Sequence, residues 1–397
     1  MERSRQLYTP IFDLLQKHSR YVDVRHIQTL ALMVQGLLSS QSLNLTAWEP
    51  FVQSRAKEAQ SYQRRWSRFM RNKRVQSLEL YVPLALQALS LSKTARVYLA
   101  LDTSQLWNEF CLISISIVTC GRAVPLVWRV IKHESASVAF GEYQPLLVEA
   151  QKALKDFGDV MLLADRAFAS HALMHWLRDM NWHWCLRIKS DVQIHGPRAI
   201  PVTVEQLFPA SGEATFYRQV GLWEDGLERV NLALANLPTA EEPWAVITDE
   251  APTLMTFEYY GKRFDTEELY LDSKSGAFQL EDSRLDEAKH LERLYLVAAV
   301  AILFSTLQGM AVQFAGLRRQ VDPHWKRGLS YLKIGLNWIH GVIHKGRELL
   351  ELVPLFRVDP QPCFASKQAK QRNDERFEFS KVRIRPSKYQ EVMISTS

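Results

Sequence analysis

The sequence predicts an α/β protein with a mixed β-sheet at its centre and helical segments at both ends. Three observations support this fold class. Hydrophobic residues recur at helical spacing, with few Gly or Pro, through residues 1–92. Short apolar runs bounded by turn residues then alternate with helical stretches as far as residue 189. Long apolar helical stretches return near the end, over residues 285–309 and 325–350.

The expected order of elements narrows the fold further. Three apolar runs come first, and Cys-Gly-Arg-Ala at 120–123 separates the second from the third like a hairpin turn. The expected strands span 97–102, 111–119, 124–131, 160–165 and 183–188, with helices at 143–157 and 170–180. The order of three strands, helix, strand, helix and strand is typical of an RNase H-like fold.

The chain divides into five segments. These are a helical region at 1–92, a first part of the core at 93–189, a β-rich insertion at 190–243, a second part of the core with C-terminal helices at 244–350, and a basic tail at 351–397. Gly, Pro and Thr punctuate the short segments of the insertion. The tail is expected to be loosely ordered beyond Pro360.

Composition limits the class of protein. Hydrophobic residues make up 47% and charged residues 23% of the chain, as in soluble globular proteins. Four scattered cysteines without a CxxC pair suggest neither a zinc site nor a disulfide framework, and fit a reducing cytoplasm. The polar N-terminus predicts no signal peptide. The longest apolar run, Leu296–Leu307, is too short to cross a bilayer, so no membrane partner is expected.

The charge is unevenly distributed. Residues 1–96 carry a net charge of +9 and residues 366–397 carry +4, around an acidic middle of −7. Basic residues crowd between Arg55 and Arg74, with aromatic residues interleaved. The candidate DNA contacts in this stretch are Arg64, Arg65, Arg68 and Arg71. The alternative is a solvated basic face whose aromatics belong to the core, but the scarcity of acidic residues favours DNA contact.

Two aspartates and a downstream segment predict a metal site. Asp102 and Asp165 each end an apolar strand, and adjacent strands would place these like charges side by side, where a divalent cation relieves their repulsion. The segment 260–274 has the spacing Y-x2-R-x3-E-x6-K, which puts four residues on one helix face. They are Tyr260, Arg263, Glu267 and Lys274.

Glu267 completes a set of three carboxylates that can hold two Mg²⁺ ions about 3.5–4 Å apart. Either aspartate alone would be a turn or cap residue, but three acids together with the Y-R-E-K spacing favour the metal site. Glu268 points about 100° away from Glu267 on a helix, and Glu292 is a poorer match.

These motifs resemble those of bacterial insertion-sequence transposases of the DDE type, in the group that carries the Y-R-E-K signature. The matching segments lie within roughly residues 20–350. They are Leu-Ala-Leu-Asp102-Thr, Leu-Leu-Ala-Asp165-Arg-Ala-Phe, Trp244-Ala-Val-Ile-Thr, the Y-R-E-K segment and His290-Leu-Glu-Arg-Leu. The resemblance implies an RNase H-like catalytic core with a β-rich insertion between the second and third acids.

The resemblance also implies roles for individual residues. Asp102, Asp165 and Glu267 would form the metal-binding catalytic triad. Tyr260, Arg263 and Lys274 would contact phosphates near the transposon end.

Two further residues have two interpretations each. Trp244, on the strand before the Y-R-E-K segment, would stack on a base flipped out during hairpin formation, or it is a core aromatic. Arg166 follows the second aspartate and could contact DNA or pair with an acid.

The sequence therefore predicts a DNA transposase that cuts transposon ends and joins them to target DNA. Its expected cofactor is a pair of Mg²⁺ ions, for which Mn²⁺ would substitute. Its expected partners are double-stranded DNA, at the terminal inverted repeats and the target, and a second copy of itself in a homodimer on DNA. The expected location is the bacterial cytoplasm, at the nucleoid.

Two alternatives belong to other functional classes. One is an RNase H-like DNA nuclease that hydrolyses without joining. The other is a transposase-derived repressor that only binds DNA, against which the presence of all three acids argues.

Overall fold

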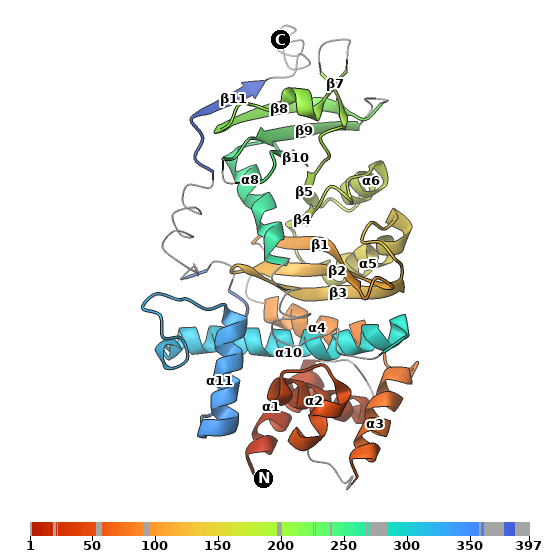
Figure 1. Cartoon of the computed structure of the whole chain (residues 1–397), viewed down its shortest axis with the longest axis vertical. Coiled ribbons are helices and arrows are strands. Elements are labelled where there is room, and N and C mark those ends of the chain that lie inside the picture. Colours follow the sequence, from red (N-terminus) through yellow and green to blue (C-terminus); the bar gives the residue numbers. More distant parts are fainter. Residues whose placement is uncertain are drawn as a thin grey trace.

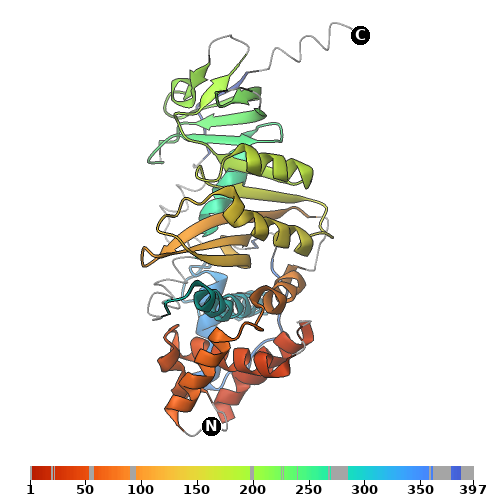
Figure 2. The same ribbon diagram turned by 90° about the vertical axis from the view of Figure 1, so that its right-hand side faces the viewer.

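The computed structural model describes residues 2–18, 21, 23–52, 58–89, 95–196, 201–224, 226, 228–238, 240–266, 269, 285–356, 359–360 and 377–385. The molecule is elongated, with the N-terminal helices at one end and the strands stacked along its long axis towards the other (Figures 1 and 2).

The N-terminal region is helical, as predicted. Its elements are α1 (Glu2–His18), α2 (Val24–Ser40), the 3₁₀ helix η1 (Leu45–Phe51), α3 (Ala59–Arg71) and α4 (Ser77–Leu89). Asp23 caps the N-terminus of α2, and its carboxylate accepts the backbone N–H of Arg25 at 3.0 Å. Helices α2, α3 and α4 all contact a long C-terminal helix, α10 (Ala288–Phe314), so this region shares the core of the protein.

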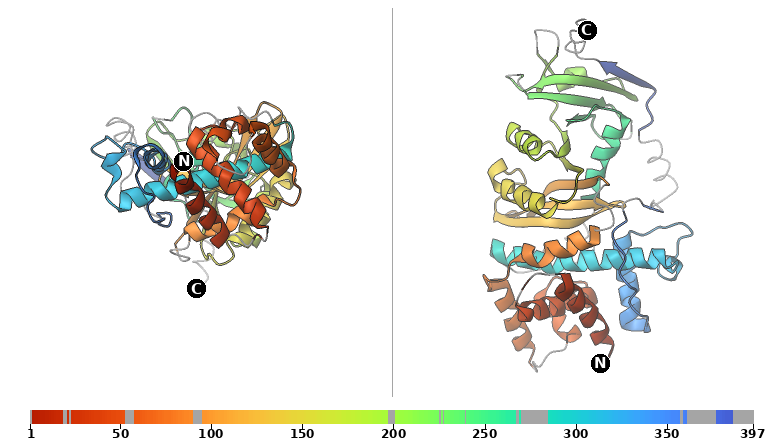
Figure 3. Two further views of the ribbon diagram at one scale, coloured as in Figure 1. Left: turned by 90° about the horizontal axis from the view of Figure 1, so that it is seen from below. Right: turned by 180° about the vertical axis from the view of Figure 1, so that it is seen from behind.

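The central sheet confirms the RNase H-like prediction. Its first elements are β1 (Val97–Leu106), β2 (Phe110–Thr119), β3 (Arg122–Lys132), α5 (Phe140–Ala153), β4 (Val160–Ala164), α6 (His171–Asp179) and β5 (His183–Arg187). The strand order is β3-β2-β1-β4-β5, with β1, β2 and β3 antiparallel and β4 and β5 parallel to β1. Helices α5 and α6 lie on the side of the sheet opposite α8 (Leu254–Gly261), as Figures 1 and 3 show.

The predicted hairpin break forms a two-residue turn between β2 and β3. Cys120 and Gly121 both have positive φ, 51° and 75°. This combination suits a type I′ turn, whose twist matches that of the flanking strands.

The insertion does not form a separate sheet. Its elements are β6 (Gln193–His195), β7 (Val202–Thr203), α7 (Val204–Leu207), β8 (Glu213–Leu222) and β9 (Glu228–Ala235). Strand β10 (Trp244–Thr248) pairs with β5 on one side and β9 on the other, so core and insertion share one sheet, with eleven strands among the described residues.

The C-terminal segments differ in places from the prediction. The 3₁₀ helix η5 (Arg318–Gln320) follows α10, and α11 (Tyr331–Lys345) begins later than expected. The buried carboxylate of Asp322 accepts backbone N–H groups of His324 and Gly328, which holds residues 322–328 in a loop instead of a helix. Strand β11 (Lys381–Arg385), in the tail expected to be loosely ordered, pairs in parallel with β8.

Helix α10 is the buried centre of the helical half. By length and composition it could cross a membrane, but its most apolar stretch is entirely buried within the fold. Trp128 of β3 donates its indole N–H to the Glu292 carbonyl at 3.0 Å and packs between Tyr81 of α4 and Tyr295 of α10. A core helix of a globular fold accounts for this apolar segment.

Helices α10 and α11 cross at a pair of glycines. A Cβ on Gly309 would lie 1.8 Å from the Tyr331 carbonyl oxygen, and a Cβ on Gly335 would lie 1.7 Å from that of Ser305. We expect Gly335→Ala to destabilise the protein by about 1–3 kcal/mol, because two backbones would have to separate. Thermal or urea unfolding measures this change.

Gly141→Ala is the matched control, because a Cβ there meets nothing within 4 Å and the residue lies in α5. Equal unfolding free energies for the two variants would contradict the close crossing.

Candidate active site

The two aspartates lie side by side at the end of the parallel β1–β4 ladder. That ladder pairs Val97 with Val160 and ends at Leu101 with Ala164. Asp102 and Asp165 are the next residues on the two strands. Since directly neighbouring residues in a sheet project from the same face, both carboxylates point to one side of it.

One detail of the prediction was wrong. Asp102 does not end β1, which continues to Leu106, because residues 102–106 still pair with β2. Asp102 instead marks the point where β4 stops and β1 loses its parallel neighbour. The end of β4 at Ala164 agrees with the prediction for Asp165.

The Y-R-E-K segment begins differently from the expectation of a helix over 260–274. Helix α8 already starts at Leu254 and ends at Gly261, and the 3₁₀ helix η2 (Lys262–Phe264) follows. Thr253 provides a capping box, which explains the earlier start. Tyr260 therefore lies in the last turn of α8 and Arg263 in η2, which contacts both β1 and β4.

Both described members of the signature contact the aspartates. The Tyr260 hydroxyl donates to Asp165 Oδ1 at 3.4 Å, and Arg263 Nη1 lies 3.4 Å from Asp102 Oδ2. The opposite oxygen of Asp102 accepts the Thr103 backbone N–H at 2.9 Å. One short segment thus reaches both carboxylates from the same face of the sheet.

Burial sets the chemistry of these contacts. The Arg263 side chain is 7% exposed, with its guanidinium 4.7 Å from the Phe264 ring centre, so its charge lies where solvent screens it weakly. Burial raises the pKa of Tyr260 to about 12, so its hydroxyl stays protonated at neutral pH and can donate to Asp165.

The remaining acids fall into two groups. Glu267, its neighbour Glu268 and the signature residue Lys274 lie outside the described residues. Glu292, the poorer sequence match, lies on α10, where its carboxylate accepts the Val130 backbone N–H of β3 at 3.3 Å. Strand β2 lies between β3 and β1, the strand of Asp102. Glu292 therefore contacts the edge strand β3 and not the strand that carries Asp102.

Trp244 lies in an aromatic cluster next to the signature residues. Its side chain is 4% exposed, and its ring centre lies 5.3 Å from that of Tyr260 and 5.6 Å from that of Phe264. The ring centre of Phe377, far along the chain, lies 5.8 Å from that of Trp244. In this state Trp244 is a core aromatic, and stacking on a base would require it to leave the cluster.

Arg166 pairs with an acid, the second of its two interpretations. Its guanidinium lies 3.2 Å from Glu242 Oε2, and Arg187 holds the other oxygen of the same carboxylate at 2.7 Å. Arg166 and Glu242 are both about half exposed, so solvent screens this ion pair.

The predicted arginines of α3 separate into two sets. Arg64, Arg68 and Arg71 are exposed and line one surface hollow together with Asn72. We call these three the α3 arginine row. Arg65 turns inwards instead and donates to the Thr29 hydroxyl at 3.2 Å. The interleaved aromatics Tyr62, Trp66 and Phe69 are core residues.

The donor set suits a hard divalent cation. Two carboxylates on neighbouring strands, both partly exposed, offer the oxygen ligands that Mg²⁺ and Mn²⁺ prefer. The family resemblance implied phosphate contacts for Tyr260 and Arg263, but their contacts with Asp165 and Asp102 were not predicted. The offsets of 3, 4 and 7 residues predicted a shared helix face but not which residues that face contacts.

Residues 113–304 match the family model described as Transposase DDE domain, just under half of the chain. The matched region includes Asp165 and Glu267 and begins after Asp102. Comparison with curated proteins found no match.

Two solved structures are similar over part of their length. One is a piggyBac transposase synaptic complex with hairpin DNA, at 10% identity and a TM-score of 0.41, covering 87% of this chain and 78% of that chain. The other is Marinitoga piezophila Argonaute in complex with 5′ OH guide RNA and target DNA, at 14% and 0.21, covering 53% and 30%. Both TM-scores are too low to carry an inference about this chain.

The RNase H-like sheet, the paired aspartates and the family match together support a DDE transposase.

Proposed function

We propose that this protein is a transposase of the bacterial insertion-sequence group with the Y-R-E-K signature, and that it cuts the ends of a mobile DNA element and joins them to target DNA. The observation that carries the proposal is the meeting of Asp102 and Asp165 beneath one segment whose Arg263 and Tyr260 contact them. Turn or cap residues would not need partners 161 and 95 residues away in the chain.

Asp102, Asp165 and Glu267 would hold two divalent ions, Mg²⁺ with Mn²⁺ as a substitute. When bound, these ions supply charge neutralisation at the reacting phosphate and a water or hydroxyl of lowered pKa. The aspartates are the described part of this ligand set, and Glu267 follows Arg263 by four residues in the sequence.

Arg263 and Tyr260 would act as positioning residues for the acids. Each contacts a different carboxylate, so each restricts one ligand before the ions and DNA arrive. Arg263 also lowers the electrostatic repulsion between the two aspartates. Lys274 and, once DNA is bound, Arg263 would also contact phosphates beside the scissile bond.

Two further residues would change partners on DNA. Arg166 would exchange Glu242 for a phosphate, which costs little because the pair is half exposed. Trp244 would leave its aromatic cluster to stack on a flipped base, a contact worth roughly 1–3 kcal/mol.

The α3 arginine row would grip the DNA backbone. Helix α3 carries no acidic residue, and the three exposed arginines follow each other at spacings of four and three, so they share one face. A row of exposed cations on a helix that contains no acidic residue is the expected footprint of phosphate binding.

Substitution of the α3 arginine row by glutamine should weaken DNA binding and flatten its salt dependence. Three lost phosphate contacts would reduce the slope of log affinity against log salt by about 2.7. Fluorescence anisotropy across a range of salt concentrations measures this slope. Point substitutions are preferable to truncation, because α2, α3 and α4 pack on α10.

The exposed Lys132 and Lys152 on the core provide a control double substitution to glutamine, compared with the α3 variant per charge removed. If that control flattens the slope as much as the α3 variant does, the main DNA contacts are not on α3.

The proposal includes assembly and location. The protein would act as a homodimer on DNA, bound to the terminal inverted repeats and to target DNA, in the bacterial cytoplasm at the nucleoid. The basic N-terminal region, with its net charge of +9, supports a polyanionic partner.

Strand transfer tests the function directly. Purified protein is incubated with Mg²⁺, a labelled duplex carrying the inverted repeats that flank the gene, and a target plasmid. We expect end cleavage followed by labelled plasmid. Cleavage without joining would establish the nuclease alternative, and binding without cleavage would establish the repressor.

A further inference from the structure

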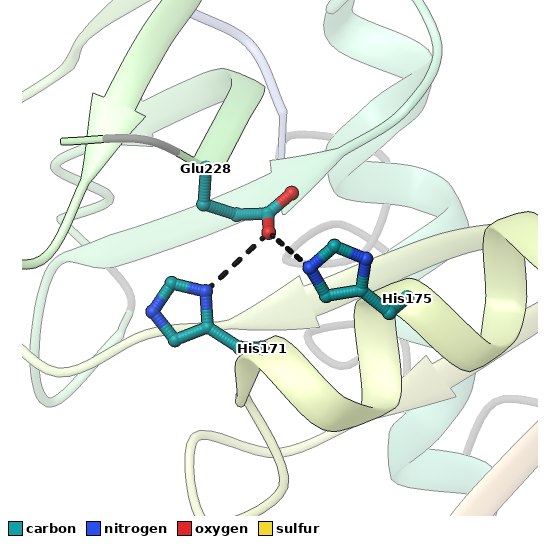
Figure 4. Close-up of side chains that lie close together, drawn as sticks. All are labelled: His171, His175 and Glu228. Carbon is teal, nitrogen blue, oxygen red and sulfur yellow. Dashed lines mark hydrogen bonds and ion pairs between the residues drawn. The ribbon is translucent and has the colours of Figure 1, made fainter. Parts of the chain in front are cut away.

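Three metal-ligating side chains meet away from the aspartates. His171 and His175 lie one turn apart on α6, and Glu228 is the first residue of β9 (Figure 4). Their ligand atoms all lie within 4.8 Å of one another. The two histidines come from the core and the glutamate from the insertion, so the cluster joins two parts of the chain.

The distances in this cluster suit a bound ion as well as they suit long hydrogen bonds. His171 Nδ1 and His175 Nε2 each lie 3.4 Å from the same atom, Glu228 Oε2. In N–H···O hydrogen bonds the nitrogen and oxygen usually lie about 2.7–3.2 Å apart. Ligand atoms held about 2.0–2.2 Å from a tetrahedral Zn²⁺ lie about 3.3–3.6 Å apart. The two nitrogen–oxygen separations match edges of that tetrahedron.

The carboxylate is held in place by its surroundings. The Glu228 side chain is 4% exposed, and Arg178, one turn after His175 on α6, pairs with its other oxygen, Oε1. Arg178 therefore leaves Oε2 directed at the histidines. The Trp223 ring packs on the His171 imidazole with ring centres 3.9 Å apart, which restricts that ring too. Such supporting contacts are typical of metal sites.

A second cluster in the described part of the chain lacks these features. Asp286, Glu287 and His290 are close neighbours at the start of α10, and the two carboxylates are exposed. All three come from one stretch of five residues, so this cluster joins no separate elements. Its two carboxylates belong to the solvent-exposed residues just before α10, and the cluster carries no metal-site proposal.

We propose that His171, His175 and Glu228 bind a divalent transition metal of the zinc class, which fastens α6 to β9. Two imidazole nitrogens and one carboxylate oxygen are ligands that Zn²⁺ and Co²⁺ accept, whereas Mg²⁺ prefers oxygen alone. Three protein ligands leave a fourth position for water. The scattered cysteines gave no sign of such a site, because its ligands are histidine and glutamate.

The site would be structural. It is built on different residues from the aspartate centre, and it would tie the insertion to the face of the core that α6 covers. Bound metal would stabilise the folded protein, because the ligands are brought together only in that state.

Cobalt spectroscopy of the full chain tests the proposal. Excess Mg²⁺ is added first to fill hard oxygen sites, and Co²⁺ is then titrated while its visible absorption is followed. We expect the strong bands of four-coordinate Co²⁺, saturating at an equimolar amount, displaced by Zn²⁺ and insensitive to further Mg²⁺. Zn²⁺ should also raise the melting temperature of the protein.

His175→Ala is the decisive variant, because its side chain is 66% exposed and its loss should leave the fold intact. We expect it to bind Co²⁺ at least about tenfold more weakly and to lose the Zn²⁺-induced rise in melting temperature. Glu287→Gln, in the other cluster, should bind like wild type. Absence of four-coordinate bands, or unchanged bands in His175→Ala, would overturn the proposal.

Discussion

Replacing Asp165 by asparagine should abolish DNA cleavage and joining, with a loss of at least about 10³-fold in rate and little change in DNA affinity. Asp102→Asn and Glu267→Gln should behave in the same way. Each substitution keeps the size of the side chain but removes a charged ligand for the ions that neutralise the reacting phosphate. Cleavage of a labelled transposon end and anisotropy on the same duplex measure the two properties.

Two other glutamates serve as matched controls. Glu268 is adjacent to Glu267 in sequence, and Glu292 accepts a backbone N–H of β3 on the far side of β2. Their glutamine variants should cut DNA at rates close to wild type. If Glu267→Gln cut normally while either control failed, the third acid would be misassigned.

Arg263→Ala should reduce cleavage by about 10–100-fold, the usual effect of losing a side chain that orients a metal ligand. The arginine is 7% exposed and pairs with Asp102, so its loss frees that carboxylate to rotate and increases the repulsion from Asp165. The apparent Mg²⁺ requirement of cleavage should rise, while DNA affinity should change much less, because the α3 arginine row remains.

Arg263→Lys separates charge from geometry. Lysine restores the charge but cannot reproduce the planar fork, so we expect it to recover only part of the activity. A Mg²⁺ requirement that stays at the wild-type level in Arg263→Ala, with DNA affinity lost instead, would show that the arginine contacts only phosphate.

Local patterns predicted the strands of the core well. The runs around β2, β3, β4, β5 and β10 were visible because buried strands form short apolar stretches between turn residues. Asp102 was misread as a strand end, because an acidic residue after an apolar run resembles a boundary. Its pairing with Ser114 of β2 keeps the strand going, and that partner is not a local signal.

The pairing of strands far apart in the chain could not be predicted from local sequence patterns. The insertion contains β-strands, as expected, but only the pairing of β10 with both β5 and β9 joins it to the core sheet. Strand β11 exists because residues 381–385 meet β8, over 150 residues earlier in the chain. No composition or periodicity of a short basic segment encodes such a partner.

The sequence predicted which residues belong to the candidate site, but it did not predict most of the contacts between them. Asp102 and Asp165 were expected to be neighbours, and the register of β1 and β4 agrees. The spacing of Tyr260 and Arg263 predicted that they share a face, but it did not predict that this face contacts Asp165 and Asp102. Arg65 was predicted to contact DNA with the other arginines of α3. It turns inwards because it donates to Thr29 of α2, and that contact between two helices is not visible in the local sequence.

The His171–His175 spacing was the available signal for the second cluster, and Glu228 could not be linked to it from sequence.

Iron-mediated cleavage of the protein backbone tests most directly whether Asp102, Asp165 and Glu267 form one metal site. The protein is loaded with Fe²⁺ in place of Mg²⁺ and treated with ascorbate and peroxide, and the cut positions are mapped by mass spectrometry. The cuts that excess Mg²⁺ suppresses should cluster near residues 102, 165 and 267 and disappear in Asp165→Asn. Mg²⁺-sensitive cuts around Glu292 or elsewhere, with none near the two aspartates, would contradict a catalytic metal centre at this edge of the sheet.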